Sequence, residues 1–280
     1  MHFFTASGLR PDLNGDRMNA DDYAFRFGGI ERLYGRRVLH AFRDAHIAVI
    51  GLGGVGSWAA EALARSGIGT ITLVDMDDIC VSNTNRQLHA LEGQYGRTKT
   101  DAMAERLKAI NPQAHIRIHF GFLTLKNLTD LITPDMTGVI DAIDSVKPKA
   151  ALIAHCQRGK IPIICAGGAG GQTDPTKILV ADLSKTTQDP LLAKVRNLLR
   201  REYGFSRNPK RRFGMEAVYS TEQLTYPAED GEVCRQKPAT AGPSRLDCAS
   251  GFGASCPVTA SFGLFAASRL LNRIARRTNL

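Results

Sequence analysis

The chain has 280 residues, 43% hydrophobic and 22% charged, the balance of an ordinary globular protein with one large or two modest domains. Lys and Arg outnumber Asp and Glu by 36 to 27, and the formal charge of +9 favours a polyanionic partner: nucleic acid, nucleotide or an anionic membrane. The six cysteines form no C-x-x-C pair, which argues against a four-cysteine zinc site, and the N-terminal residues contain no apolar run long enough for an export signal. We therefore expect a cytoplasmic protein with reduced thiols.

Short apolar runs alternate with helical stretches along the first two thirds of the chain. Residues 1–20 are expected to form a flexible tail, and apolar positions at helical spacing follow in 21–45. The expected strands are 46–50, 70–75, 115–120, 138–144 and 161–166, and the expected helices are 55–66, 98–110, 124–132 and 147–158. This alternation predicts an α/β fold: a Rossmann-like, doubly wound, mainly parallel sheet with helices on both faces.

The alternation ends after the apolar run 177–183. A basic helix is expected over 188–203, and residues 204–256 are rich in Gly, Pro, Ser and charge without a clear period. We therefore divide the chain into the tail 1–20, a nucleotide-binding domain 21–183, a basic insertion 184–256 for substrate binding and a terminal helix 257–280 on the core. The weakly polar stretch 251–271 is too interrupted to span a bilayer, so membrane association is not expected.

The strongest local signal is a glycine cluster between the first expected strand and the next helix. Gly51, Gly53 and Gly56 form G-x-G-x-x-G, with Gly54 between them. Glycine permits a tight turn and lets phosphate approach the backbone, while the helix N-terminus supplies N–H groups. Asp75 ends the second strand, where a carboxylate can accept hydrogen bonds from ribose hydroxyls. NAD, FAD and ATP fit these features equally well.

The polar residues that follow the second strand favour a triphosphate over a dinucleotide. They are Asp77, Asn83 and Arg86, with Lys99 near the start of the next helix. A nicotinamide pocket does not need two cations, whereas a triphosphate carries about four negative charges that Arg86 and Lys99 can neutralise. Asp144, at the end of the strand 138–144, suits a Mg²⁺ ion that bridges the phosphates.

The motifs G-x-G-G-x-G, D-x-D, S-N-x-x-R-Q, a following lysine and D-x-x-D resemble the adenylation domain shared by ubiquitin-activating enzymes and the bacterial activators of sulfur-carrier proteins. The resemblance covers about residues 20–183. It implies ATP as the nucleotide, with Asp75 on the ribose, Asn83, Arg86 and Lys99 on the phosphates, and Asp144 on magnesium.

The segment R-F-G-G-I-E-R at 26–32 resembles the family segment that supplies an arginine to the ATP of the partner subunit. The resemblance implies a homodimer with composite sites. Arg32 is the first choice for this role, and Arg26 is the second.

Further stretches narrow the resemblance: RFGGIERLYG, GGVGSWAAEALARSGIG, DMDDICVSNTNRQLHAL, DAIDSVKPKAALI, CAGGAGGQTDPTKI, TQDPL and DCASGFGASCPVTASFG. They look like the dehydratases that act on threonylcarbamoyladenosine in transfer RNA, and they span most of residues 23–265. The implied reaction is ATP-dependent cyclisation through adenylation of the threonyl carboxylate. Adenylation of the C-terminus of a small ubiquitin-like sulfur-carrier protein, as in the thiamine or molybdopterin pathways, is the alternative. An NAD-linked oxidoreductase, or a nucleotide-binding module without turnover, is a third class.

A basic segment is the expected RNA-binding surface. Between residues 194 and 212 there are eight basic residues and one acidic residue, and Phe205 and Phe213 lie among them. Basic charge binds phosphates, and aromatic rings can stack on unpaired bases. The residues predicted to bind tRNA are Arg200, Arg201, Arg207, Lys210, Arg211 and Arg212. A second basic cluster lies at Arg269, Arg273, Arg276 and Arg277, and no role is assigned to it.

Cys234 is a candidate nucleophile because it lies where the related activators place their crossover-loop chemistry. A thiolate there could take over an acyl adenylate or accept sulfur from a partner protein, although direct ring closure requires no thiol. Cys80 follows an apolar isoleucine and is expected in the core. His89, His115 and His155 show no metal-ligand spacing, and structural roles are expected for them.

Overall fold

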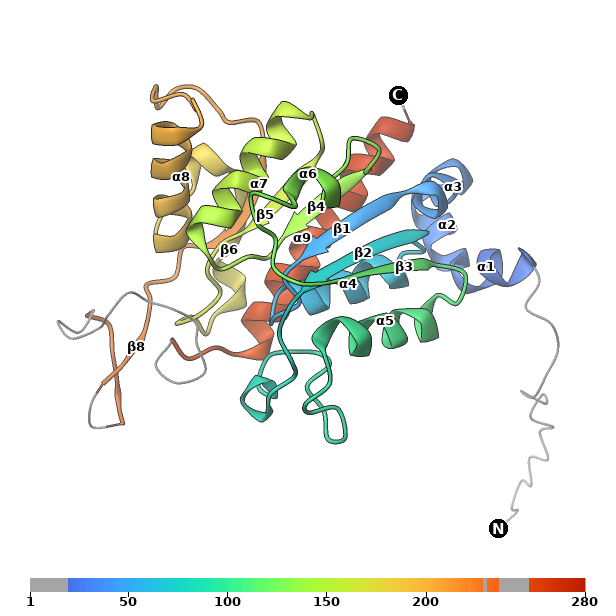
Figure 1. Cartoon of the computed structure of the whole chain (residues 1–280), viewed down its shortest axis with the longest axis horizontal. Helices are drawn as coiled ribbons and strands as arrows, with labels where there is room; N and C mark the ends of the chain where they lie inside the picture. The colour runs from blue at the N-terminus through green and yellow to red at the C-terminus, as the bar shows by residue number, and fades with distance from the viewer. Residues whose placement is uncertain (1–19, 229–230, 237–251, 280) are drawn as a thin grey trace, which may run out of the picture.

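The computed structural model describes residues 20–228, 231–236 and 252–279 (Figure 1), so the expected tail lies outside the described residues except for its last residue. A seven-stranded sheet has the order β3-β2-β1-β4-β5-β7-β6. Neighbouring strands are parallel, except that β6 runs antiparallel to β7. The strands are β1 (His46–Ile50), β2 (Thr70–Asp75), β3 (His115–Phe120), β4 (Gly138–Asp141), β5 (Ile163–Ala166), β6 (Ile178–Asp182) and β7 (Glu216–Ser220). The predicted α/β class, mainly parallel and Rossmann-like, is confirmed.

Helices cover both faces of the sheet because successive residues of each central strand point to opposite sides. In β1, Ile47 and Val49 belong to one apolar core, and Ala48 and Ile50 belong to the other. The first core contains residues of α3, α4, α5 and α9, and the second contains residues of α6, α7 and α8, on the opposite side of the sheet in Figure 1. The bounds are α3 (Arg36–Asp44), α4 (Gly56–Arg65), α5 (Lys99–Ile110), α6 (Leu128–Leu131), α7 (Val146–Arg158), α8 (Pro190–Glu202) and α9 (Cys256–Thr278).

The segment 21–45, predicted to be helical, divides into three short helices. They are α1 (Ala20–Arg26), α2 (Gly28–Tyr34) and α3. Gly35 separates the last two at φ +90°, a conformation that residues with a side chain rarely adopt. Tyr23 and Phe27 of the first part are buried against Leu39 of α3, which anchors α1 to the domain.

The segment 204–256 contributes a strand to the sheet, although no period was visible there. β7 lies between β5 and β6, so the division at residue 183 does not separate the sheet from the insertion. The rest of the described insertion holds α8, which packs on α7, and a small hairpin of β8 (Tyr226–Pro227) and β9 (Val233–Cys234).

Two sequence-based expectations about single side chains are wrong. Phe205 and Phe213 are each only 6% exposed, and their ring centroids lie 4.9 Å apart in the core beneath α8. These rings cannot stack on RNA bases, because they are buried in the apolar core and a base cannot reach them. Cys80, expected in the core, is exposed next to the short 3₁₀ helix Val81–Asn83.

None of the helices in the described segments has an apolar stretch that could cross a bilayer, and this includes the 23 residues of α9. Helix α9 instead lies against α4 and the sheet. Gly263 is at the closest point, because a Cβ atom added there would lie 2.3 Å from the carbonyl oxygen of Val55. Val55 is the N-cap of α4, so the C-terminal helix supports the backbone that follows β1.

Gly263→Ala should therefore destabilise the protein. The new methyl group must push α9 away from α4, and the gain of about 1 kcal/mol in helix propensity does not offset this. We expect the free energy of unfolding in urea to fall by about 1–3 kcal/mol net, the usual effect of overpacking. Gly253→Ala is the matched control, because a Cβ there meets nothing within 4 Å. Equal stability of the two variants would contradict the close packing of α9 on α4.

Candidate nucleotide-binding site

The strand order reverses at β1, and ligands of open parallel sheets bind at such a point, beyond the carboxyl ends of the strands. From β1 the chain proceeds to β2 and β3 on one side, and then returns to β4 on the other side. Gly51 therefore follows β1 directly beside Ala142, which follows β4. The topology alone thus brings the glycine cluster and the D-x-x-D segment together.

The glycine turn between β1 and α4 has no room for side chains at its two ends. Gly51 adopts φ +89°, and a Cβ atom there would lie 2.9 Å from the Ala142 carbonyl oxygen. A Cβ at Gly56 would lie only 1.7 Å from the Gly51 carbonyl oxygen. Among the described residues, no group accepts a hydrogen bond from the amides of Gly53, Gly54 or Val55. Free amides at the N-terminus of a ten-residue helix are suited to a phosphate group.

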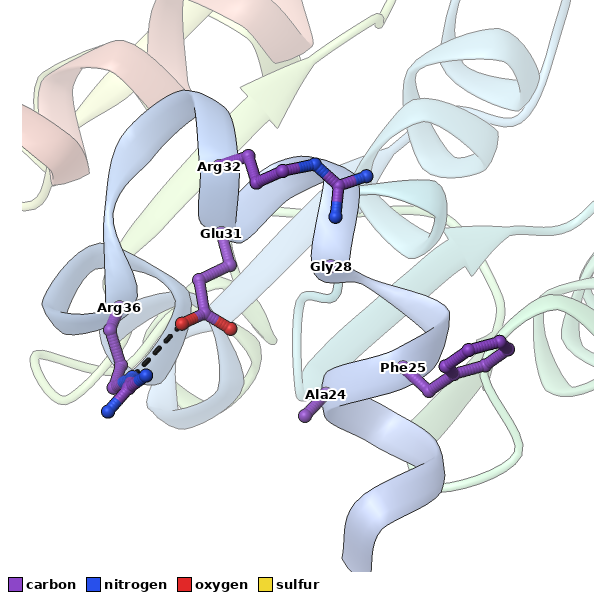
Figure 2. Close-up of a pocket in the computed structure, with 6 residues that line it drawn as sticks. All are labelled: Ala24, Phe25, Gly28, Glu31, Arg32 and Arg36. Carbon is purple, nitrogen blue, oxygen red and sulfur yellow. Dashed lines mark hydrogen bonds and ion pairs between the residues drawn. The ribbon is translucent and has the colours of Figure 1, made fainter.

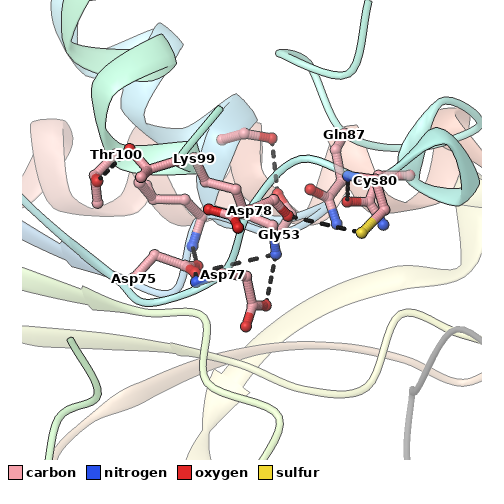
Figure 3. A network of polar contacts seen from close by, with 12 residues as sticks. Gly53, Asp75, Asp77, Asp78, Cys80, Gln87, Lys99 and Thr100 are labelled. Atoms are coloured by element: carbon pink, nitrogen blue, oxygen red, sulfur yellow. Dashed lines mark hydrogen bonds and ion pairs between the residues drawn. The ribbon is translucent and has the colours of Figure 1, made fainter. Parts of the chain in front are cut away.

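Asp75 fixes this turn from the end of β2. Its Oδ2 accepts a hydrogen bond of 2.6 Å from the Leu52 amide, and its Oδ1 accepts one of 2.8 Å from the Asp77 amide. Lys99 Nζ lies 2.7 Å from Asp77 Oδ2 and 4.0 Å from Asp75 Oδ1. The three residues lie together in Figure 3. Lys99 is only 5% exposed and opens α5, so its charge is held at a fixed place beside the turn.

Arg86 contributes a cation that no carboxylate of the described residues neutralises. Its Nη1 donates to the Ser82 carbonyl and to Asn85 Oδ1, both at 2.9 Å. Trp58 of α4 donates from Nε1 to the Arg86 carbonyl at 3.1 Å. A Cβ atom at Gly54 would lie 3.1 Å from Arg86 Cγ, so the absence of a side chain at Gly54 lets the arginine lie against the turn.

Asn83 and Asn85 are both engaged within the chain. Asn83 is 3% exposed, and its Oδ1 accepts a hydrogen bond from the Cys80 amide at 3.1 Å, which closes the 3₁₀ turn. Its contact with phosphate stays a prediction. Asn85 belongs to the polar run that follows the second strand, and its Nδ2 donates to the Ala254 carbonyl at 2.7 Å. This bond ties the arginine segment to the residues that precede α9.

Asp144 is exposed beyond β4 and makes no hydrogen bond or ion pair with a described residue. In the part of the chain that the structure describes, no cluster of three or more His, Cys, Asp or Glu could hold a metal by itself. Magnesium in nucleotide sites is commonly held by one or two carboxylates together with substrate phosphates. A free carboxylate on the segment that closes against the glycine turn fits that arrangement.

Sequence reasoning missed a buried ion pair beneath this loop. Asp141, the first aspartate of D-x-x-D, lies 3.0 Å from Lys149 of α7, and neither side chain is exposed. Nothing in a single sequence distinguishes this lysine from the solvated lysines around it.

Arg32 lies on α2 at a hollow of about 830 Å³, lined by Ala24, Phe25, Gly28, Glu31, Arg32 and Arg36 (Figure 2). Arg36 pairs with Glu31 at 3.0 Å, whereas Arg32 is exposed and makes no hydrogen bond or ion pair with a described residue. Arg26, the second choice for the arginine given to a partner, pairs with Asp22 and donates to the Ile110 carbonyl. The structure therefore leaves Arg32 available and engages Arg26.

Two of the six predicted RNA-binding residues contact neighbouring side chains, and five of the six, including Arg201, are exposed. Arg200 lies over the Phe213 ring at 5.4 Å, and Arg201 pairs with Glu202 at 2.7 Å. Arg207, Lys210, Arg211 and Arg212 are exposed in the loop after α8. The Asp182 carboxylate accepts hydrogen bonds from the Phe213 amide at 2.9 Å and the Gly214 amide at 2.7 Å, which anchors the far end of this loop to β6.

Cys234 is half-buried in β9, and its thiol donates to the Gln236 carbonyl at 3.1 Å. It hydrogen-bonds to none of the described residues around the glycine turn. The structure does not bring Cys234 together with Arg86 or Lys99 through any such contact.

His89 lies beside the lysine of the site. It is 4% exposed, its Nε2 lies 3.1 Å from Gln87 Oε1, and its Nδ1 has no hydrogen-bond partner within the described residues. Burial and the charge of Lys99 lower the pKa of His89 to about 4. The ring is therefore neutral near pH 7 and adds no charge to the site.

The fold and the glycine turn are those of a nucleotide-binding enzyme family, and the family model of the ThiF family matches residues 29–279. The chain belongs to the ThiF family. It is 55% identical over 255 residues to the tRNA threonylcarbamoyladenosine dehydratase of Escherichia coli K12, covering 91% of this chain and 95% of that protein.

Solved structures of the Escherichia coli tRNA N6-threonylcarbamoyladenosine dehydratase, TcdA, are similar throughout. The complex with ATP has a TM-score of 0.83 at 49% identity, covering 93% of this chain and 98% of that one, and another is a complex with AMP. The molybdopterin-synthase adenylyltransferase of Salmonella typhimurium LT2 is 36% identical over 124 residues, covering 44% of this chain and 49% of that protein.

The lowered pKa of His89 predicts a pH-dependent stability. In the unfolded chain His89 takes up a proton near its ordinary pKa of 6.5, but in the folded protein only near a pKa of about 4. Neutral His89 therefore has its full stabilising effect on the folded state above pH 6.5, and this effect is lost as the pH falls towards 4. In wild type this loss should reach about 2 kcal/mol between pH 7 and pH 5, and His89→Gln should lack it. Urea denaturation at both pH values measures the difference. His115→Gln, which removes an exposed histidine, is the control, and parallel profiles for wild type and His89→Gln would contradict the assignment.

Proposed function

We propose that this protein catalyses the ATP-dependent dehydration of N6-threonylcarbamoyladenosine in tRNA, by ring closure through adenylation of the threonyl carboxylate. The observation that carries the proposal is the glycine turn with unpaired amides beside Arg86, whose charge no described carboxylate neutralises. A nucleoside triphosphate suits such a site better than a dinucleotide, because its negative charge is concentrated on the phosphates. The identity to dehydratases across 91% of the chain supports this tRNA substrate.

The chemistry follows from the poor electrophilicity of a carboxylate. An oxygen of the threonyl carboxylate attacks the α-phosphorus of ATP, the bond to the β-phosphate breaks, and pyrophosphate leaves with the bonding electrons. The carbamoyl group then attacks the activated carbonyl carbon, loses a proton, and expels AMP. One molecule of water is removed from the nucleoside overall. Positioning favours this closure, since effective molarities of intramolecular reactions reach about 10⁵ M or more.

The chain's residues have the following roles in the proposal. Gly51, Gly53, Gly54 and Gly56 form the turn that receives the phosphates, Asp75 and Asp77 border the ribose, and Asn83, Arg86 and Lys99 neutralise or hold the phosphates. Asp144 would hold Mg²⁺ together with those phosphates, and the ion would supply positive charge to the departing pyrophosphate. Support comes from the exposed, unpaired Asp144 carboxylate and from the fixed position of Lys99.

The proposal includes a homodimer in which Arg32 reaches the ATP of the partner subunit. Its exposure at an open hollow, without a described partner of its own, supports this role. Cys234 is kept as a candidate for sulfur or acyl transfer with a partner protein. Its half-buried position permits this, although the ring closure above needs no thiol. We place the reaction in the cytoplasm, where ATP and tRNA are both present.

We also propose that the insertion 184–256 binds the tRNA, with the exposed basic residues after α8 on its phosphates. Residues 21–183 bind the nucleotide, and 257–280 support them from below the glycine turn.

The decisive test is mass spectrometry of tRNA nucleosides after incubation with ATP. Wild type should convert threonylcarbamoyladenosine into a product lighter by one water. Arg86→Ala should lower tRNA-dependent pyrophosphate release at least about 100-fold, because it removes a charge from the departing phosphates. Arg65→Ala, which breaks only an ion pair to Glu61, is the control. Wild-type rates in Arg86→Ala would refute the phosphate assignment, and pyrophosphate release with a Gly-Gly-ended carrier protein but not with tRNA would favour the alternative substrate.

Reversing the exposed basic residues to Glu tests the RNA surface: Arg207, Lys210, Arg211 and Arg212 together. We expect tRNA binding to weaken at least about 100-fold and its dependence on salt to become shallower, because fewer counterions are released. Four reversals at exposed sites elsewhere, Lys108, Lys126, Arg158 and Lys160, change the net charge equally and control for long-range effects. Equal loss of affinity in the two quadruple variants would place the tRNA elsewhere.

A further inference from the structure

The strand β4 ends on a buried ion pair that no role described so far explains. Asp141 and Lys149 are both fully buried, with Lys149 Nζ 3.0 Å from Asp141 Oδ1. The same Nζ donates to the Ile143 carbonyl at 2.9 Å and to the Asp141 carbonyl at 3.3 Å. The ammonium group therefore uses its donors on one short stretch of backbone.

That stretch is the segment 142–143, which precedes Asp144. Asp141 Oδ1 accepts a hydrogen bond from the Ile143 amide at 3.1 Å, so the pair holds both the N–H and the C=O of Ile143. Between the held groups lies Ala142, whose carbonyl oxygen is 2.9 Å from the position of a Gly51 Cβ. Lys149 thus fixes the backbone that closes against the glycine turn and leads to the free carboxylate of Asp144.

Stability alone does not account for this pair. Removing two charges from water costs several kcal/mol per ion, and well-packed apolar residues of the same volume are often as stable or more stable. An apolar pair could fill the same space, but it could not hold two backbone carbonyls. The feature peculiar to Lys149 is this control of backbone position.

We propose that Lys149 is a positioning residue for adenylation: it holds the segment 142–144 so that Asp144 faces the phosphates of ATP and their magnesium ion. This inference rests on the proposed function, because it uses the assignment of Asp144. Lys149 touches neither substrate nor nucleotide in this scheme and acts only through the backbone after β4.

Lys149 also acts on a second buried carboxylate. Burial raises the pKa of Asp189, and the charge of Lys149 opposes that rise. Asp189 accepts hydrogen bonds from the Gly168 amide at 2.9 Å and the Leu192 amide at 2.8 Å, at the start of α8. Loss of the lysine alone would leave two buried carboxylates short of a cation, and Lys149→Met by itself could unfold the protein for that reason.

The test therefore compares two variants. One is a double variant that combines Asp141→Asn and Lys149→Met, and the other is the single variant Lys149→Arg. The double variant removes both charges of the pair and the ammonium group that donates to the two carbonyls. The Asn side chain can still accept a hydrogen bond from the Ile143 amide. Lys149→Arg retains a cation with several donors. Thermal melting first establishes that each variant is folded. Should the double variant fail to fold, Asp141→Asn combined with Lys149→Gln, which removes both charges but keeps an N–H donor, takes its place in the same measurements.

The first readout is hydrogen–deuterium exchange of peptides covering 142–146 in the absence of ligand. Exchange should accelerate at least about tenfold in the double variant, because the segment loses the bonds that hold it closed. The second readout is calorimetric binding of ATP with Mg²⁺ and of AMP. Affinity for ATP with Mg²⁺ should fall by about 10–100-fold, as with other groups that orient a metal ligand, and by more than the affinity for AMP. Lys149→Arg should restore both readouts to within about threefold of wild type.

A folded double variant with wild-type exchange and wild-type ATP binding would overturn the proposal, since the pair would then be structural only. Asp144→Asn provides a further check, because two residues that act through one segment are not additive. In the Asp144→Asn background, the change at Asp141 and Lys149 should add little to the loss of ATP binding, and a full additive loss would overturn the coupling. Failure of the proposed function itself gives a different result: wild type would release no pyrophosphate with tRNA, whereas exchange and ATP binding are measured without tRNA.

Discussion

Close backbone packing at the glycine turn is the constraint around which the neighbouring elements are arranged. The space between the Gly51 carbonyl and Gly56 admits no side chain, and the Ala142 carbonyl closes the turn from β4. On the other side, Gly263 lets α9 approach the Val55 carbonyl. Three segments distant in sequence therefore meet at van der Waals distance around one turn. Each of them can lie there only because backbone, and not side chain, occupies the contact.

The close packing leaves the amides of the glycine turn without hydrogen-bond acceptors among the described residues, although the neighbouring side chains are held by hydrogen bonds and ion pairs. Asp75 accepts hydrogen bonds from the Leu52 amide after β1 and from the Asp77 amide after its own strand, and Lys99 is held by Asp77. Among the described residues, no carboxylate pairs with Arg86 or accepts a hydrogen bond from the free amides of the turn. Unpaired amides and a cation at the start of a helix are groups that suit an anion, and they support the proposed binding of a polyphosphate.

The sequence predicted the alternation of strands and helices, because apolar runs such as 46–50 and 138–144 are bounded by clear breaks, although the strand in the second run ends at Asp141. It also located the glycine turn and its neighbouring cations, whose spacing follows from the strand–turn–helix order. It did not reveal β7, since Glu216–Ser220 is a short strand within a polar stretch and its pairing with β5 is decided by distant residues. The exposure of Phe205 and Phe213 was predicted wrongly for a similar reason. Their basic neighbours in the sequence indicate a surface segment, whereas the fold buries both rings in the core. The Asp141–Lys149 pair also depends on tertiary contact, which no local pattern reports.

Asp182 illustrates how the protein separates a stable framework from a surface that can change. Its carboxylate accepts hydrogen bonds from the backbone amides of Ser184, Phe213 and Gly214. These bonds join the end of β6 to Phe213 and Gly214, which follow the basic loop. The two ends of the excursion from β6 through α8 and back to β7 are thus clamped by a single side chain. Residues could be inserted or removed at the exposed tip with little strain on the sheet, because the entropy of closing a loop rises only slowly with its length. The exposed tip is therefore free to change in length and sequence while the sheet and the glycine turn keep their places.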